Sequence, residues 1–270
     1  MMRTAPPAPA GVPRLLAVPA AIALLFLLLP LGALVARVEW PTLWDDVTTP
    51  AALSALALSL ATATIATAIC ILVGIPLAIR IARARPAIAA VLRVLVTIPL
   101  VLPPLVGGVA LLFLYGGSSH VGAWLERAGV ALPFTTAAVI VAQVFVALPF
   151  LVIAVEGSVR TAGTDYERTA ASLGAGRWTT LRRVTLPLAV DGIVAGVILC
   201  FARAIGEFGA TALFAGNAPG VTQTMPLAIY TAFNGSGLGQ GPAVALALLL
   251  LVTVLVVLLV VRSWRPGGVR

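Results

Sequence analysis

The chain has 270 residues, of which 61% are hydrophobic and only 10% are charged. A water-soluble domain carries about 25% charged residues, so this composition indicates a polytopic membrane protein. All 17 basic residues are arginine, and the lack of lysine excludes the phosphate-binding P-loop of an ordinary nucleotide hydrolase. The formal charge of +8 comes from arginines that mostly flank apolar runs, which indicates membrane topology and not nucleic-acid binding.

Six apolar runs are each long enough to cross a bilayer, which takes about 20 residues. The predicted fold is therefore an all-α integral membrane protein with six transmembrane helices, in a domain spanning residues 14–262. A Pro/Ala-rich segment, 1–13, is predicted to be a disordered cytoplasmic N-terminus, and 263–270 a cytoplasmic tail. The first run resembles a signal peptide, but its length favours a retained span. The predicted spans are 15–36, 51–79, 89–115, 134–155, 188–214 and 243–261.

Arginine placement predicts the orientation of these spans. With both termini in the cytoplasm, only Arg37 and Arg127 lie outside, and Arg203 lies within the fifth span. The positive-inside rule favours this topology, in the plasma membrane, over its inverse. The other arginines are then cytoplasmic: 3, 14, 80, 83, 85, 93, 160, 168, 177, 182, 183, 262, 265 and 270.

Few side chains in the apolar segments are suited to chemistry. Cys70 and Cys200 lie in separate apolar runs without a metal-binding spacing, so they are predicted to be small core residues. His120 is the single histidine, which disfavours a histidine-based metal or acid–base site. Glu156 and Asp191, at the ends of the fourth and fifth spans, are interpreted as interfacial or capping residues.

The third predicted span is rich in residues that interrupt helices. Lipid does not tolerate broken backbone hydrogen bonds, whereas a bundle interior or a cavity does. This span is therefore predicted to line a translocation path or to pack within the bundle, although proline kinks without any ligand are the simpler alternative. The residues concerned are Pro99, Pro103, Pro104, Gly107 and Gly108.

The longest polar segment of the chain, 165–187, falls on the cytoplasmic side between the fourth and fifth spans. Asp165 is predicted to cap a helix that begins at Tyr166, and Gly174 to end it in the left-handed conformation. A second short helix is predicted from Arg177. One face of the first helix carries apolar residues spaced four and three apart: Tyr166, Ala170 and Leu173. The segment is interpreted as a docking element for a cytosolic partner, or alternatively as a plain amphipathic connector.

The spacing within this segment resembles the Glu-Ala-Ala loop of ABC importer permeases. Gly174 is followed after nine residues by Val184-Thr185-Leu186-Pro187, as in that family. Six residues before Gly174, Arg168 stands where the family usually has glutamate, and the acid is displaced by one position to Glu167. The resemblance implies a type I, MetI-like permease core whose cytoplasmic coupling helices, at Asp165, Tyr166, Glu167, Arg168, Ala170, Leu173, Gly174, Arg177, Leu186 and Pro187, dock on two ATPase subunits.

A second resemblance concerns the apolar segments. Residues 201–211 (FARAIGEFGAT) are similar to the fifth span of molybdate permeases, as are 98–108 (IPLVLPPLVGG) and 225–230 (MPLAIY). Sulfate and tungstate permeases carry close variants. The resemblance implies import of an oxyanion, molybdate first, with sulfate, thiosulfate or tungstate as alternatives. It also implies a second permease copy and an extracytoplasmic binding protein, with ATP and Mg bound by the partner ATPase and no cofactor or catalytic residue in this chain.

Arg203 and Glu207 are ionisable residues inside the fifth span, where a charge costs about 2.5–3.5 kcal/mol. At positions i and i+4 of one helix they are predicted to pair, which lowers that cost. The pair either locks the helix to its neighbours or lines the path of an oxyanion. Gly206 and Gly209 are predicted to form a close-packing helix face.

Two other functional classes are disfavoured. An intramembrane enzyme needs convergent polar groups at matched depth, and the spans offer only Arg203 and Glu207. A secondary transporter driven by an ion gradient commonly shows inverted repeats or acids in several spans, and neither is evident here.

Overall fold

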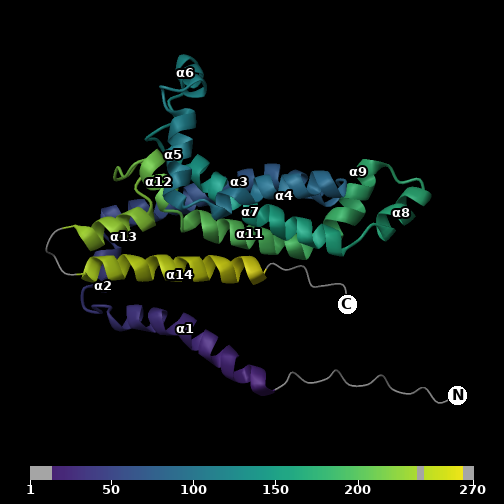
Figure 1. The fold of residues 1–270 in the computed structure, drawn as a ribbon. Coiled ribbons are helices and arrows are strands. Elements are labelled where there is room, and N and C mark those ends of the chain that lie inside the picture. The colour runs from purple at the N-terminus through teal and green to yellow at the C-terminus, as the bar shows by residue number, and fades with distance from the viewer. Residues whose placement is uncertain (1–13, 236–239, 264–270) are drawn as a thin grey trace.

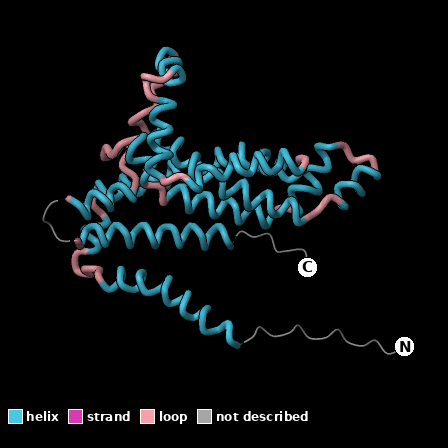
Figure 2. The backbone as a smooth tube through the Cα atoms, viewed as in Figure 1, coloured by secondary structure: helices cyan, strands magenta, loops and turns pink. Residues whose placement is uncertain are grey.

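The computed structural model describes residues 14–235 and 240–263, and within these residues the chain is helical with no strand. Figure 2 shows helices joined by short loops over the described residues. The predictions for residues 1–13 and 264–270 lie outside this part of the chain. The all-α prediction is confirmed for the residues that are described.

Four single helices are long and apolar enough to cross a membrane: α1 (Ala17–Ala36), α3 (Pro50–Ala82), α7 (Thr136–Thr161) and α14 (Gly241–Ser263). Two further pairs pass the same test together but are bent. These are α4 (Pro86–Val101) with α5 (Pro104–Tyr115), and Arg177–Leu188 with α11 (Val190–Ile205). The described residues therefore hold four to six candidate spans, and the number six stays a prediction.

Helices α3, α7 and α11 lie side by side and form the centre of the bundle (Figure 1). Their contact surfaces are built from small and branched residues, including Ala63, Ala66, Ala147 and Leu151, all fully buried. Small residues let helix backbones approach closely, which is how helices associate in lipid. Cys70 and Cys200 belong to this core as free thiols, as predicted.

Helix α1 lies beside α14 and apart from the rest of the bundle (Figure 1). A short 3₁₀ turn (Arg14–Leu16) precedes it, and none of its residues is buried. Its side chains are almost all apolar and exposed, so lipid or another subunit must cover them.

The third predicted span, 89–115, is not one continuous helix. Helix α4 ends at Val101, and α5 begins at Pro104 after a bend of 108°. Pro103 and Pro104 lack backbone N–H groups, so the helical hydrogen bonds cannot continue through them. Helix α5 instead packs against α12 (Gly209–Phe214) and leads to α6 (His120–Arg127), which stands away from the bundle (Figure 1).

The fifth predicted span, 188–214, is also divided, because α11 ends at Ile205 and α12 begins at Gly209. The predicted outer segments contain two more helices, α2 (Leu43–Val47) and α13 (Met225–Asn234); residues 236–239 lie outside the described part. The start of α1 and the end of α14 lie at the same end of the molecule as α8 (Asp165–Ser172) and α9 (Arg177–Thr180), and α2 and α13 lie at the other (Figure 1).

Candidate functional site

The polar segment 165–187 forms a helical hairpin at one end of the bundle. Helix α8 is followed by a turn, by α9, by a π-helical turn (Leu181–Thr185) and by α10 (Leu186–Leu188). The prediction that Asp165 caps the first helix is wrong: Thr164 is the N-cap and Asp165 is already helical. Its carboxylate instead lies 3.9 Å from the guanidinium of Arg168, within the first turn. The predicted start of the second helix at Arg177 is confirmed.

Gly174 ends α8 as predicted. Its φ is +83°, in the left-handed region that glycine adopts without a steric penalty. The N–H of Gly174 donates to the carbonyl of Ala171, and the N–H of Ala175 donates to that of Ala170, both at 3.0 Å. These two bonds form a Schellman motif, which satisfies the last carbonyls of the helix. The direction of the chain between α8 and α9 is therefore set by this glycine.

Glu167 joins three segments of the chain. Its Oε1 atom accepts a hydrogen bond from Arg83 Nη2 at 2.7 Å and one from Thr185 Oγ1 at 2.8 Å. Arg83 follows the last residue of α3, and its guanidinium also donates to the carbonyl of Gly163 at 2.9 Å. The acid therefore faces the protein, whereas the side chain of Arg168 is 78% exposed. Sequence reasoning missed Arg83 and Thr185, because they are 84 and 18 residues away from Glu167.

The hairpin exposes three large apolar side chains. Tyr166, Leu173 and Trp178 are 65%, 83% and 67% exposed, and Ala170 is half-buried. The guanidinium of Arg182 lies 5.7 Å from the centre of the Trp178 ring, a cation–π distance that orients the indole. Exposed aromatic and apolar side chains of this kind are typical of the core of a protein interface. Leu186 is half-buried and Pro187 is exposed, where the hairpin meets the bundle.

The second candidate region surrounds the break between α11 and α12. The predicted ion pair is present, with Arg203 Nη2 and Glu207 Oε2 2.5 Å apart. The two residues are not on one helix, however, because α11 ends at Ile205. Glu207 is 1% exposed, and its Oε1 atom accepts the N–H of Ala210 at 2.7 Å. The carboxylate therefore binds Arg203 and also satisfies a backbone N–H in the first turn of α12.

Close contacts join α5 to α12 beside this ion pair. A Cβ atom on Gly209 would lie 2.8 Å from Pro104 Cβ, and one on Gly108 would lie 2.8 Å from the carbonyl oxygen of Ala210. A Cβ atom on Gly107 would lie 3.1 Å from the ring of Phe145. These glycines let the helices approach. Two other predicted site residues lie at the surface of the chain, Pro103 and Gly206.

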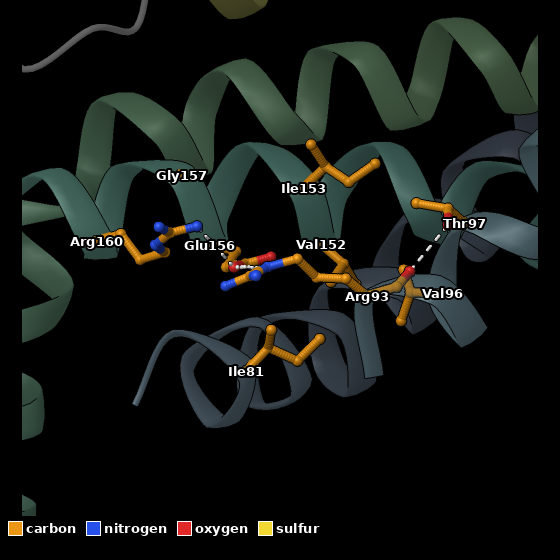
Figure 3. Close-up of a pocket in the computed structure, with 9 residues that line it drawn as sticks. All are labelled: Ile81, Arg93, Val96, Thr97, Val152, Ile153, Glu156, Gly157 and Arg160. Carbon is orange, nitrogen blue, oxygen red and sulfur yellow. Dashed lines mark hydrogen bonds and ion pairs between the residues drawn. The ribbon is translucent and has the colours of Figure 1, made fainter. Parts of the chain in front are cut away.

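A third cluster of charges was misinterpreted from the sequence. Glu156 neither extends toward solvent at the membrane interface nor caps a helix: it lies inside α7, is buried, and pairs with Arg93 of α4 at 2.6 Å and with Arg160 at 3.7 Å. Figure 3 shows both arginines turned toward the carboxylate. The spacing of four residues between Glu156 and Arg160 could have predicted their pairing from the sequence. The pairing of Arg93 with Glu156 depends instead on the packing of α4 against α7.

A family profile described as "Binding-protein-dependent transport system inner membrane component" matches residues 71–266. The chain belongs to this family. The matched residues of this inner membrane component include the α8–α9 hairpin, the Arg203–Glu207 pair and the cavity around Glu156.

Curated relatives of this inner membrane component cover most of its length. The molybdenum transport system permease proteins ModB of Mycobacterium bovis and Mycobacterium tuberculosis are each 50% identical over 222 residues, 82% of this chain and 84% of theirs. The sulfate transport system permease protein CysT of Escherichia coli is 34% identical over 209 residues, 76% of either chain.

Solved structures show the same fold at low identity. A chain from a bacterial ABC transporter involved in the import of alginate matches with a TM-score of 0.75 and 18% identity, over 94% of this chain and 95% of that one. A chain of the MetNI methionine ABC transporter in an inward-facing conformation matches with a TM-score of 0.61 and 18% identity, over 78% and 94%. The MetI-like fold of this inner membrane component is thereby shown.

Proposed function

We propose that this chain is the permease subunit of an ABC importer that takes up molybdate. The observation that carries the proposal is the 50% identity to two molybdenum permeases over 82% of the chain. The sequence motifs at residues 98–108, 201–211 and 225–230 resemble the same group of permeases, and sulfate and tungstate permeases carry close variants of them. The importer would draw its energy from a separate ATPase subunit, because this chain has no lysine with which to build a P-loop.

In this proposal two copies of the chain surround a pore, and two ATPase subunits dock on the exposed face of the α8–α9 hairpin. The hairpin would lie in the cytoplasm with both termini, as six spans in residues 14–262 and the positive-inside rule require. ATP and Mg would bind to the ATPases alone. The proposed coupling residues are Asp165, Tyr166, Glu167, Arg168, Ala170, Leu173, Gly174, Arg177, Leu186 and Pro187.

The mechanism would be alternating access by rigid-body motion. Closure of the ATPase dimer would bring two hairpins together, and Glu167 would pass that movement to α3 through Arg83 and to α10 through Thr185. The anion would cross between paired copies of the third and fifth spans. The residues proposed to line or shape that path are Pro103, Pro104, Gly107, Arg203, Gly206, Glu207 and Gly209.

The test is uptake by proteoliposomes that contain the permease and its ATPase, with the cognate extracytoplasmic binding protein outside. We expect ATP-dependent accumulation of molybdate, and stimulation of ATP hydrolysis by binding protein loaded with molybdate. Tungstate, sulfate and thiosulfate are the comparison substrates. Accumulation of sulfate with no molybdate uptake would favour the CysT-like alternative, and uptake without any ATPase would refute the importer.

A further inference from the structure

A cavity of about 320 Å³ lies between α3, α4 and α7, around the charged cluster of Glu156 (Figure 3). Its charged side chains are Arg93, Glu156 and Arg160, and its apolar walls include Ile81, Val96 and Ile153. The walls are mainly apolar, with the three charges gathered at one side. The cavity thus offers an apolar trough beside an ionic cluster.

The ionic cluster carries an excess positive charge. Arg93 donates from Nε to Glu156 at 2.6 Å, so one arginine already neutralises the buried carboxylate. Arg160 approaches the same carboxylate only to 3.7 Å, and its side chain is 57% exposed. An arginine carries five N–H donors, so its guanidinium retains donors for a second anionic group. Two arginines against one glutamate attract an anion to this cavity.

The cavity lies at the level where the helices end. Ile81 is next to the last residue of α3, Arg160 is next to the last residue of α7, and Arg93 lies two turns into α4. These helix ends lie on the same side of the molecule as the α8–α9 hairpin (Figure 1). Ile153 is 45% exposed, and Val94 and Leu95 on the adjoining face of α4 are 62% and 55% exposed. The apolar trough therefore continues onto an apolar outer surface.

We propose that this cavity binds an anionic phospholipid, with its phosphate on Arg160 and Arg93 and the start of an acyl chain along Val96 and Ile153. Basic pockets between membrane helices at the cytoplasmic level suit anionic headgroups. An inorganic oxyanion has no apolar part that could pack against the apolar walls, and moving an ion from water to an apolar surface costs free energy. A phospholipid has a phosphate for the arginines and an acyl chain for the apolar walls. The lipid would bridge α4 and α7 next to the hairpin, and its binding does not depend on the transported substrate.

The test is native mass spectrometry of the full-length protein in mild detergent, with equal concentrations of phosphatidylglycerol and phosphatidylcholine. The wild type is expected to retain phosphatidylglycerol preferentially. Arg160→Gln keeps the Arg93–Glu156 pair and is expected to weaken that binding about fivefold, the effect of one arginine near an anionic headgroup. Arg85→Gln, an exposed arginine at the same level and outside the cavity, is the matched control and should change binding less than about twofold.

Two further variants separate a binding site from a structural ion cluster. Glu156→Gln keeps an oxygen that accepts from Arg93 but removes the competing negative charge, so it should strengthen phosphatidylglycerol binding. Gly157→Leu keeps every charge and fills the cavity, because a Cβ atom at Gly157 meets nothing within 4 Å. It should reduce lipid retention while the melting temperature is unchanged or higher.

Three results would overturn the proposal. Equal loss of lipid in Arg85→Gln and Arg160→Gln would show general attraction to a basic surface. Undiminished lipid binding by folded Gly157→Leu would place the lipid elsewhere. Displacement of phosphatidylglycerol by millimolar inorganic phosphate or molybdate would show that the cavity takes an inorganic oxyanion.

Discussion

Arg83 and Glu167 are 84 residues apart in the chain, and their side chains meet at 2.7 Å. The first follows α3, in the centre of the bundle, and the second lies in the first turn of α8, in the hairpin. Thr185, at the start of the return into the bundle, donates to the same carboxylate oxygen. The hairpin is thereby attached to both of the elements that would have to move with it.

Glu167→Ala is expected to uncouple the hairpin from the bundle. It removes one charge-assisted bond and one hydroxyl bond between side chains that are about three-quarters buried, a loss of about 2 kcal/mol in stability. ATP hydrolysis stimulated by loaded binding protein should fall, and the melting temperature should decrease. Arg168→Ala is the control for the melting temperature, because the Arg168 side chain is 78% exposed and pairs with exposed Asp165.

Exchanging the two residues, as Glu167→Arg with Arg168→Glu, tests whether the position of the acid matters. The exchange conserves net charge but places an arginine against Arg83, so coupling is expected to fall as in Glu167→Ala. Coupling equal to the wild type would mean that the shape of the hairpin around Gly174 carries the contact and the charge does not.

Gly174→Ala is expected to distort the turn between α8 and α9. The position has a φ of +83°, where a Cβ atom costs about 1 kcal/mol. Gly176→Ala is a close control, because both glycines have open space around them and only Gly174 has a positive φ. The measurement is co-purification of the ATPase with each variant. Equal retention of the ATPase by both variants would contradict a role for the left-handed turn.

Arg203→Met is expected to destabilise the protein by about 3 kcal/mol, because it leaves Glu207 buried without its cation. Combining it with Glu207→Gln removes the stranded charge and keeps an oxygen for the N–H of Ala210. The double variant should therefore reach higher membrane abundance than the single one. If the double variant is as poorly inserted as the single variant, the pair does not act through mutual neutralisation.

Gly209→Ala is expected to push α12 away from α5. Its Cβ atom would lie 2.8 Å from Pro104 Cβ, and overpacking of this kind costs about 1–3 kcal/mol. Gly206→Ala is the control, since Gly206 is exposed and a Cβ atom there would meet only the carbonyl of Ala202 at 3.4 Å. Thermal unfolding of the purified variants in detergent measures the difference. Equal melting temperatures of the two variants would show that α5 can move away from the added methyl group without loss of stability.

Local chemistry explains what could be predicted from the sequence. The four long helices follow from unbroken apolar runs, because a helix in lipid satisfies its own backbone hydrogen bonds. The end of α8 at Gly174 and the start of α9 at Arg177 also depend on neighbouring residues alone. The pairing of Arg203 with Glu207 was predictable from a spacing of four, although the helix that was expected to carry it ends between them.

Contacts between distant segments account for the rest. Pro103 and Pro104 predict a break in the helix of the third span, but the bend of 108° between α4 and α5 depends on the packing of α5 against α12. Glu156 looked like an interfacial residue because Arg93, which neutralises it, lies 63 residues earlier on another helix. The sequence suggested that Glu167 is a displaced docking charge. In the structure its carboxylate accepts hydrogen bonds from Arg83 and Thr185, which lie in other segments of the chain. The lengths of the apolar runs and the residues in the turns determine where the helices lie in the sequence. The partner of each buried charge is determined only when those helices pack against one another.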